Sequence, residues 1–211
     1  MKRLIFASCL LALPTTAAVI ADNLSAGPFQ NGTPIGNSVM QAFGLDIGSA
    51  TLLFTSLETI FDNNSPQTSR VVSGGIYSDN GGNPNALLMA FNLITMTAQS
   101  LDATLSSTTA SSFDLLPNTR YWFVLAGPLA TGLNWQTDLA NTAPAGSVFA
   151  STVGYRSTSN SGASWSASTI NTQLRINADV VDFGLNAVPE PSTFGLAATA
   201  LLAAGLYRRR R

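Results

Sequence analysis

The sequence predicts an all-β protein: an antiparallel β-sandwich of the jelly-roll or Greek-key kind, flanked by an N-terminal signal helix and a C-terminal transmembrane helix. Only 10% of the 211 residues are charged and 45% are hydrophobic, which suits an exported β-protein. The central part consists of short apolar runs separated by Gly, Asn, Asp and Pro, and no long segment shows a 3.6-residue stripe. Each end carries an apolar segment beside basic residues.

The first 21 residues have the order of a signal peptide. Two basic residues precede an apolar run over residues 4–13, which is too short to serve as a membrane anchor. Val19 and Ala21 provide the small side chains that signal peptidase requires three positions and one position before its cut. We therefore expect cleavage between Ala21 and Asp22.

The end of the chain has three parts in a fixed order. A linker over residues 183–192 is followed by an apolar segment over 193–207 and a basic tail over 208–211. As a helix the apolar segment spans about 22 Å, short of a hydrocarbon core of about 30 Å, so we expect a marginal transmembrane helix. The positive-inside rule places the basic tail in the cytoplasm. The linker motif is Val188, Pro189, Glu190 and Pro191, and the membrane-orienting residues are Arg208, Arg209, Arg210 and Arg211.

This tripartite tail resembles the PEP-CTERM sorting signal, whose members are substrates of exosortases. The resemblance implies an inner-membrane intermediate, cutting near Pro189-Glu190-Pro191, and delivery to the cell surface or release outside the cell in bacteria that make exopolysaccharide. It implies signal peptidase and an exosortase as partners. A plain stop-transfer anchor is the alternative, but such an anchor has no reason to carry this motif. The same tail is also labelled an ice-binding protein C-terminal domain, which describes the tail alone.

Residues 22–182 are expected to form the sandwich. They contain eight short runs rich in Val, Ile, Thr, Phe and Tyr, separated by turn sequences. No internal repeat indicates a solenoid or a propeller. The expected strands are Val39–Leu45, Thr51–Ile60, Val71–Tyr77, Leu87–Ile94, Ser112–Leu115, Arg120–Ala126, Val148–Tyr155 and Gln173–Val181.

The clearest local marker is the run from Leu116 to Leu125. Its Leu-Pro-x-Thr-x-Tyr pattern resembles the tyrosine corner of fibronectin type III-like sandwiches, which implies a bond from the Tyr121 hydroxyl to the backbone upstream. The role implied for this tyrosine is structural. Strand alternation predicts that Tyr121, Phe123 and Leu125 face the core while Arg120, Trp122 and Val124 face the other way.

Two further resemblances concern the same region. Residues 158–165 resemble a degenerate Asp-box hairpin, which we interpret as a turn. The middle as a whole resembles the exported modules called choice-of-anchor domains, type R among them, which have no assigned activity. The residues that carry this second resemblance are Gln41-Ala42-Phe43, Ile76-Tyr77-Ser78-Asp79, Gly81-Gly82, Pro84, Tyr121-Trp122, Gly162 and Trp165.

Composition excludes several chemistries. The chain has no histidine, and its one cysteine, Cys9, lies in the expected signal peptide. Ser-His-Asp and Cys-His catalysis and His/Cys zinc sites are therefore excluded from the mature domain. A glycosidase needs two paired carboxylates, and no spacing pairs those present, so we expect no enzyme and no cofactor. The carboxylates considered are Glu58, Asp62, Asp102, Asp114, Asp138, Asp179 and Asp182.

Two oxygen-rich turns, at residues 62–64 and 79–83, contain ligands that calcium prefers. Asp and Asn dominate turns for conformational reasons as well. We therefore assign no metal ligand and leave a structural calcium ion open.

Two functions remain open. Only four arginines lie between the basic ends of the chain, so the middle lacks the basic face that nucleic-acid binding needs. The first function is a non-enzymatic component of the cell surface or extracellular matrix, sorted by its tail. The second is a polysaccharide-binding module of the exopolysaccharide matrix. For that module Trp135, expected in an exposed loop, is the candidate glycan contact, while Trp122 and Trp165 are expected to fill the core.

Overall fold

The computed structural model describes residues 17–24, 27–36, 38–127 and 133–181. The predicted transmembrane helix at 193–207 and residues 1–16 of the predicted signal peptide lie outside these ranges. Within them, no helix has the length and the apolar character needed to cross a membrane.

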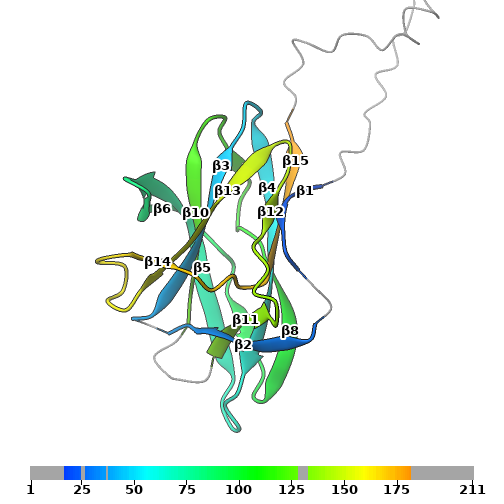
Figure 1. The fold of residues 1–211 in the computed structure, drawn as a ribbon, viewed down its shortest axis with the longest axis vertical. Helices are drawn as coiled ribbons and strands as arrows, with labels where there is room; N and C mark the ends of the chain where they lie inside the picture. Colours follow the sequence, from blue (N-terminus) through cyan, green and yellow to red (C-terminus); the bar gives the residue numbers. More distant parts are fainter. Residues whose placement is uncertain (1–16, 25–26, 37, 128–132, 182–211) are drawn as a thin grey trace, which may run out of the picture. The chain divides into compact units, whose positions relative to one another are not determined.

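The described residues form fifteen β-strands in two antiparallel sheets (Figure 1), which confirms the predicted all-β sandwich. The strands are β1 (Ala18–Asp22), β2 (Phe29–Pro34), β3 (Met40–Ile47), β4 (Leu52–Asn63), β5 (Arg70–Asn80), β6 (Asn83–Ala90), β7 (Ile94–Met96), β8 (Ser100–Ser107), β9 (Phe113–Leu115), β10 (Arg120–Ala126), β11 (Leu133–Asp138), β12 (Ala145–Gly146), β13 (Ala150–Thr158), β14 (Ser166–Ser168) and β15 (Leu174–Val180).

The first sheet has the strand order β12-β1-β15-β4-β11-β2, and β8 and β9 also pair with the long strand β4. The second sheet has the order β14-β13-β3-β10-β5-β6, and β7 pairs with β5. Neighbours in space are therefore mostly distant in sequence, as in Greek-key sandwiches. All eight predicted strand regions contain strand, and β1, β2, β8, β11, β12 and β14 were not predicted.

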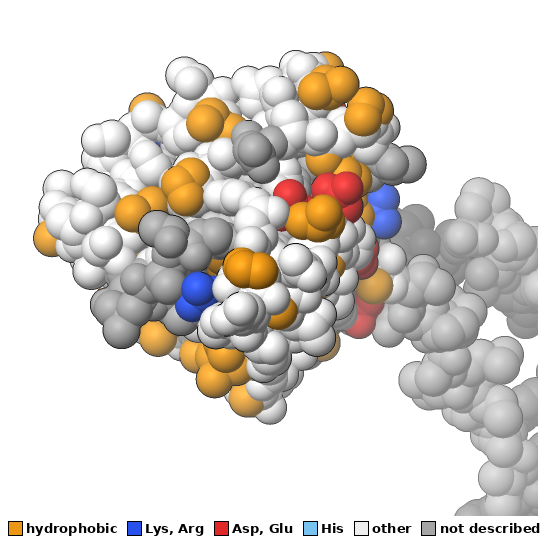
Figure 2. All heavy atoms as spheres, turned by 90° about the horizontal axis from the view of Figure 1, so that it is seen from below, with side chains coloured by type: hydrophobic (Ala, Val, Ile, Leu, Met, Phe, Trp, Pro, Cys, Tyr) orange, Lys and Arg blue, Asp and Glu red, His pale blue; other side chains and the backbone are white. Residues whose placement is uncertain are grey.

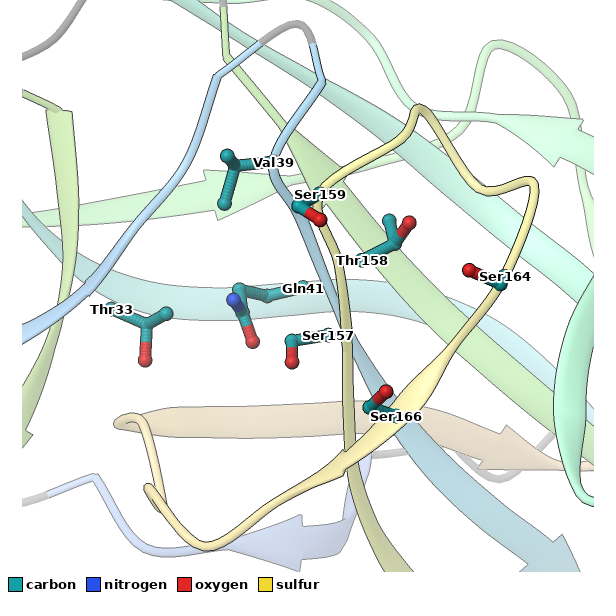
Figure 3. A pocket seen from close by; sticks show the side chains of 8 residues that line it. All are labelled: Thr33, Val39, Gln41, Ser157, Thr158, Ser159, Ser164 and Ser166. Carbon is teal, nitrogen blue, oxygen red and sulfur yellow. The ribbon is translucent and has the colours of Figure 1, made fainter.

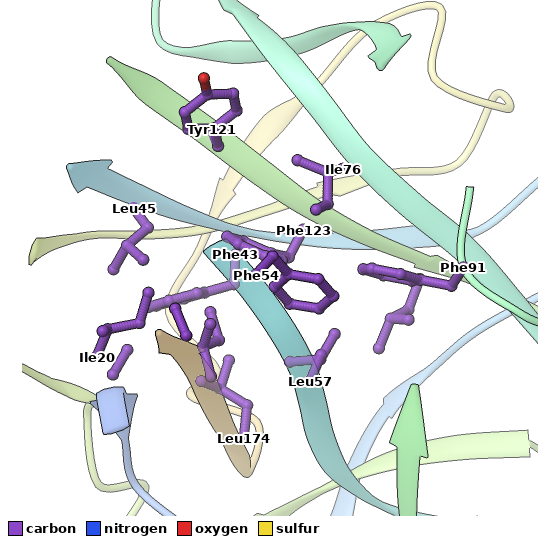
Figure 4. Packing of buried hydrophobic residues seen from close by; sticks show 14 of the residues in the cluster. Ile20, Phe43, Leu45, Phe54, Leu57, Ile76, Phe91, Tyr121, Phe123 and Leu174 are labelled. Carbon is purple, nitrogen blue, oxygen red and sulfur yellow. The ribbon is translucent and has the colours of Figure 1, made fainter. Parts of the chain in front are cut away.

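The main hydrophobic core lies between the two sheets (Figure 4). Aromatic side chains from both sheets meet there: the ring of Trp135 stacks on Phe61 at 5.9 Å and meets the edge of Tyr155 at 6.0 Å. Tyr155 in turn lies 5.0 Å from Phe43, between ring centroids. This apolar surface is what holds the domain together, because the chain has a single cysteine and therefore no internal disulfide.

Strand β10 confirms the predicted alternation. Tyr121, Phe123 and Leu125 belong to the core between the sheets, while Trp122 and Val124 belong to a separate, smaller cluster on the other side of their sheet. The predicted tyrosine corner is also present, since the backbone N–H of Leu116 donates to the Tyr121 hydroxyl oxygen at 3.1 Å. This contact ties the turn before β10 to the first residues of the strand.

Candidate functional site

The residues that the sequence assigns to sorting, Val188, Pro189, Glu190 and Pro191 with Arg208, Arg209, Arg210 and Arg211, lie outside the described residues. The structure therefore bears on the domain that the tail carries. Four features of that domain are relevant to function: the position of Trp135, a pocket at one end of the sandwich, the outer face of the second sheet, and the first strand.

Trp135 is not in an exposed loop. It lies in β11, its side chain is 0% exposed, and its indole N–H donates to the backbone carbonyl of Gln173 at 2.8 Å. The prediction of a glycan contact at Trp135 is therefore wrong, because a fully buried ring in contact with Phe61 and Tyr155 offers no face to a sugar. The sequence Gly-Leu-Asn-Trp-Gln suggested a loop because β11 is short and carries polar residues beside its apolar ones.

A pocket opens between the two sheets, with a volume of about 290 Å³. Figure 3 shows β3 and β13 supplying one wall and Thr33 of β2 standing opposite them. The hairpin between β13 and β14 closes the side. The lining residues are Thr33, Val39, Gln41, Ser157, Thr158, Ser159, Ser164 and Ser166.

The lining of this pocket is polar but uncharged. Seven of its eight side chains end in a hydroxyl or an amide, and none carries a charge. The Thr33 hydroxyl is buried and has no hydrogen-bond partner within the described part of the protein, while Gln41 is almost fully buried. Such a surface offers hydrogen-bond donors and acceptors to a neutral, hydroxyl-rich molecule, and its size is at the small end of ligand pockets.

The hairpin that lines the pocket, between β13 and β14, contains residues 158–165, which resemble an Asp-box. It forms a turn that is stabilised by its own side chains. The Asn160 side chain accepts from the Ser164 backbone N–H at 3.0 Å and donates to the Ser164 hydroxyl at 2.8 Å. The Thr158 hydroxyl accepts from the backbone N–H groups of Asn160 and Gly162, both at 3.2 Å. Sequence analysis found this turn but not the pocket, because Thr33 and Gln41 come from strands far away in the chain.

The outer face of the second sheet carries the smaller cluster around Trp122. The indole is 0% exposed, its N–H donates to Asp79 at 2.7 Å, and the guanidinium carbon of Arg156 lies 5.4 Å from the ring centroid. Gly44 allows this packing, since a Cβ there would lie 2.7 Å from the indole ring. Trp165 packs against the same cluster but is only partly buried, so the expectation that it fills the core is met in part.

Charged side chains are sparse on the end of the domain shown in Figure 2, where a few acidic and basic groups stand among uncharged surface. This face does not have the basic character that nucleic-acid binding requires.

Two of the carboxylates weighed for catalysis, Asp62 and Glu58, have structural contacts. Asp62 is buried and accepts the backbone N–H of Asp102 at 2.6 Å, and burial raises the pKa of the Asp62 carboxyl above its usual value. Glu58 forms an ion pair with Arg175 at 3.7 Å. Among the described residues, no three His, Cys, Asp or Glu side chains cluster closely enough to hold a metal ion.

The two oxygen-rich turns are also occupied by internal hydrogen bonds. Asp79 accepts from Trp122 with one oxygen and from the Gly82 backbone N–H with the other, at 3.2 Å. The Asn63 amide donates to the carbonyl of Thr97 at 2.7 Å. These contacts give Asp79 and Asn63 a structural role in their turns.

The residues expected to flank the signal-peptide cut lie inside a strand. Ala21 and Asp22 are the last two residues of β1, and Ala21 is 1% exposed. Asp22 forms an ion pair with Arg175 of β15 at 3.1 Å. A cut between them would separate two residues of a strand that is paired on both sides.

In a comparison with known protein families, residues 187–211 match the model described as the PEP-CTERM protein-sorting motif. The chain thus carries a PEP-CTERM sorting signal at its C-terminal end, as its sequence predicted. This signal supports export, surface sorting by way of the membrane, and an exosortase as the processing partner. No curated protein and no solved structure matches the chain.

Proposed function

We propose that this protein is a non-enzymatic component of the cell surface or extracellular matrix. It is exported with the help of a signal peptide, held briefly in the inner membrane by its tail, and separated from that tail by an exosortase. The observation that carries the proposal is the sorting motif at residues 187–211, which follows a folded domain whose last strand ends at Val180. The domain between the two export signals is the cargo.

The proposal is tested by intact-mass analysis of the protein from its native host, with and without the exosortase. We expect the wild-type strain to yield a form that ends near Pro189-Glu190-Pro191 in the surface or medium fraction. The exosortase mutant should accumulate the longer form in its inner membrane. A tail that persists through Arg211 in both strains would leave a membrane-anchored periplasmic domain and overturn the surface role.

A matched variant sharpens this test. Replacing Val188, Pro189, Glu190 and Pro191 by alanine leaves the apolar segment and the arginines unchanged. We expect this variant to insert in the membrane but to stay unprocessed in the wild-type strain. Normal processing of the variant would show that the motif is not what the processing enzyme reads.

A second candidate function, polysaccharide binding, is favoured by the pocket between the sheets. Its uncharged hydroxyl and amide groups match the chemistry of a neutral sugar unit. In this proposal the pocket takes the role that the sequence gave to Trp135. The ligand is a neutral residue or chain end of the exopolysaccharide, because a strongly charged sugar would find no counter-charge in the lining.

Affinity electrophoresis of the mature protein in gels that contain the host's exopolysaccharide tests this candidate. We expect retention of the wild type and loss of retention for Ser157→Val, which removes a lining hydroxyl from β13. Ser151→Val is the control, because Ser151 lies on the same strand but is exposed and outside the pocket. Absence of retention for the wild type, or equal retention of both variants, would refute polysaccharide binding at this pocket.

A further inference from the structure

Four of the five residues of the first strand, β1, lie within the segment that the sequence assigns to the signal peptide. Strand β1 pairs with β15 on one side and with β12 on the other. The Val19 side chain is 43% exposed, while Ile20 and Ala21 are 0% and 1% exposed and both belong to the core between the sheets. Strand β1 is thus a built-in part of the domain.

A cut between Ala21 and Asp22 would remove four of the five residues of β1. The core would lose the Ile20 side chain and keep the space it occupied. The backbone groups of β15 that pair with Ala18, Val19 and Ala21 would lose their partners, at a position where the other side of β15 is already paired with β4. Both losses destabilise a folded domain.

The chain after β1 supports the same conclusion. The Asn23 side chain is buried, donates to the carbonyl of Thr142 at 2.8 Å, and accepts the backbone N–H of Leu174 at 2.8 Å. Asp22 is paired with Arg175. These contacts fix the exit of β1 against β15, so the strand and the residues after it are held as one unit.

Two bonds just before the buried residues satisfy signal peptidase equally well. A cut after Ala17 has Thr15 three positions before the bond, and a cut after Ala18 has Thr16 there. All four side chains are small, as the enzyme requires. Ala17 is exposed and precedes the strand.

We propose that signal peptidase cuts after Ala17 or Ala18, so that the mature protein keeps the buried residues of β1. This inference rests on export, which is part of the proposed function, but not on exosortase processing or polysaccharide binding. The proposed cut replaces the one expected after Ala21. Val19 and Ala21 have the small side chains that the enzyme requires, but both residues belong to strand β1 of the folded domain.

The position of β1 also places the start of the mature chain beside the end of the last strand, β15. Ala18 pairs with Ala178, near the end of β15, and the backbone N–H of Val181 donates to the carbonyl of Thr51 at 3.0 Å. The new N-terminus and the last described residue, Val181, therefore lie at the same end of the sandwich. Strand β1 would stabilise β15, the strand from which the tail departs.

N-terminal sequencing of the mature full-length product from the native host tests the proposal. We expect a start at Ala18 or Val19. A start at Asp22 overturns the proposal, and a start at Met1 overturns signal-peptidase processing altogether, a result that would also remove export from the proposed function. A tail that remains uncut would affect only the exosortase step.

Two variants distinguish the bonds independently of the wild-type result. Val19→Gln places a larger polar side chain three positions before the bond after Ala21, at an exposed site, and leaves the small residues of the proposed bonds unchanged. We expect it to be processed as the wild type is. Loss of processing in Val19→Gln would overturn the proposal.

The opposite variant combines Ala17→Gln with Ala18→Gln. It alters the residue before each proposed bond and leaves Val19 and Ala21 as they are. We expect unprocessed precursor to accumulate at least tenfold over the wild type. Efficient cleavage of this double variant with a start at Asp22 would overturn the proposal.

Discussion

Two tryptophans are fully buried in this domain, but on opposite sides of a sheet and by different means. Trp135 lies between the sheets, where Phe61 and Tyr155 cover its ring and a backbone carbonyl accepts its N–H. Trp122 lies on the outer face of the second sheet, where its N–H bonds a carboxylate and Arg156 lies over the ring. The first is buried by two sheets, the second by side chains laid over one sheet.

The difference shows that strand alternation predicts which face a side chain takes but not whether that face is covered. Alternation placed Trp122 on the outer side, correctly, and yet the indole is 0% exposed. The absence of a side chain at Gly44 and the polar contacts of Asp79 and Arg156 make the covering possible. The inner core should therefore depend on apolar packing, and the outer cluster on packing and charge together.

The largest effect is expected for Trp135→Ala. Removing a fully buried tryptophan costs about 3–5 kcal/mol, a large part of the roughly 5–15 kcal/mol by which a domain is stable. We expect the variant to unfold at much lower urea concentration than the wild type, or to be recovered unfolded. Trp165→Ala is the control, because that side chain is only partly buried and should cost much less. Equal losses for the two variants would contradict the assignment of Trp135 to the core.

The outer cluster is tested by Trp122→Phe, which keeps an aromatic ring but removes the N–H donor to Asp79. A hydrogen bond to a charged group contributes about 1.5–3 kcal/mol, so we expect a loss in this range by urea denaturation. A double-mutant cycle with Asp79→Ala, which removes the acceptor, isolates the contact. Additive losses in that cycle would mean that the two side chains act independently and that packing alone holds the outer tryptophan.

The sequence predicted the all-β class, eight strand regions and the tyrosine corner because these depend on local signals: alternation, turn residues and the pattern before Tyr121. It missed β2 and β8 because their sequences are polar or contain Gly and Pro. Such strands form when a partner supplies the hydrogen bonds, as β11 does for β2 and β4 for β8. Whether such a segment forms a strand depends on its pairing with a segment far away in the chain, and no local sequence pattern indicates that pairing.

The candidate site was less predictable for the same reason. Trp135 was placed on the surface because a short run of mixed residues resembles a loop until its two neighbouring strands are known. The pocket joins Thr33 and Gln41 to Ser157 across two sheets. By contrast, the sorting signal was recognised from sequence alone, because its information lies in contiguous residues that are read as a linear motif.

A smaller effect is expected for Tyr121→Phe, which leaves the ring in the core and removes the hydroxyl that accepts the Leu116 N–H. A neutral hydrogen bond contributes about 0.5–1.5 kcal/mol, less than the charged contact of the neighbouring Trp122. Because these two residues are adjacent in β10, comparing the stability losses of the two variants compares the inner face of the sheet with its outer face. A greater loss for Tyr121→Phe than for Trp122→Phe, by urea denaturation, would reverse the expected order.

The smallest effect is expected at the ion pair of Arg120 and Asp46, which lies at the start of β10. The guanidinium donates to both carboxylate oxygens, at 2.6 and 2.9 Å, and this hydrogen bonding lowers the pKa of the Asp46 carboxyl below its ordinary value of 3.8. The side chains are 34% and 40% exposed, so solvent screens the pair and we expect Asp46→Asn to cost less than about 1 kcal/mol at neutral pH.

The pH dependence of this pair gives it a signature that the inner core lacks. Because the folded-state pKa of Asp46 is lowered, the unfolded chain binds the proton first as the pH falls below 3.8, and the stability from the pair is lost as the pH passes the lower folded-state pKa. The difference in unfolding free energy between wild type and Asp46→Asn should therefore be present at neutral pH, shrink in acid, and shrink at high salt. Asp114→Asn, at an exposed carboxylate of β9, is the control. A difference that is the same at about pH 2 and about pH 7 would mean that Asp46 stabilises the sheet by its shape and not by its charge, and the outer face would then resemble the inner core.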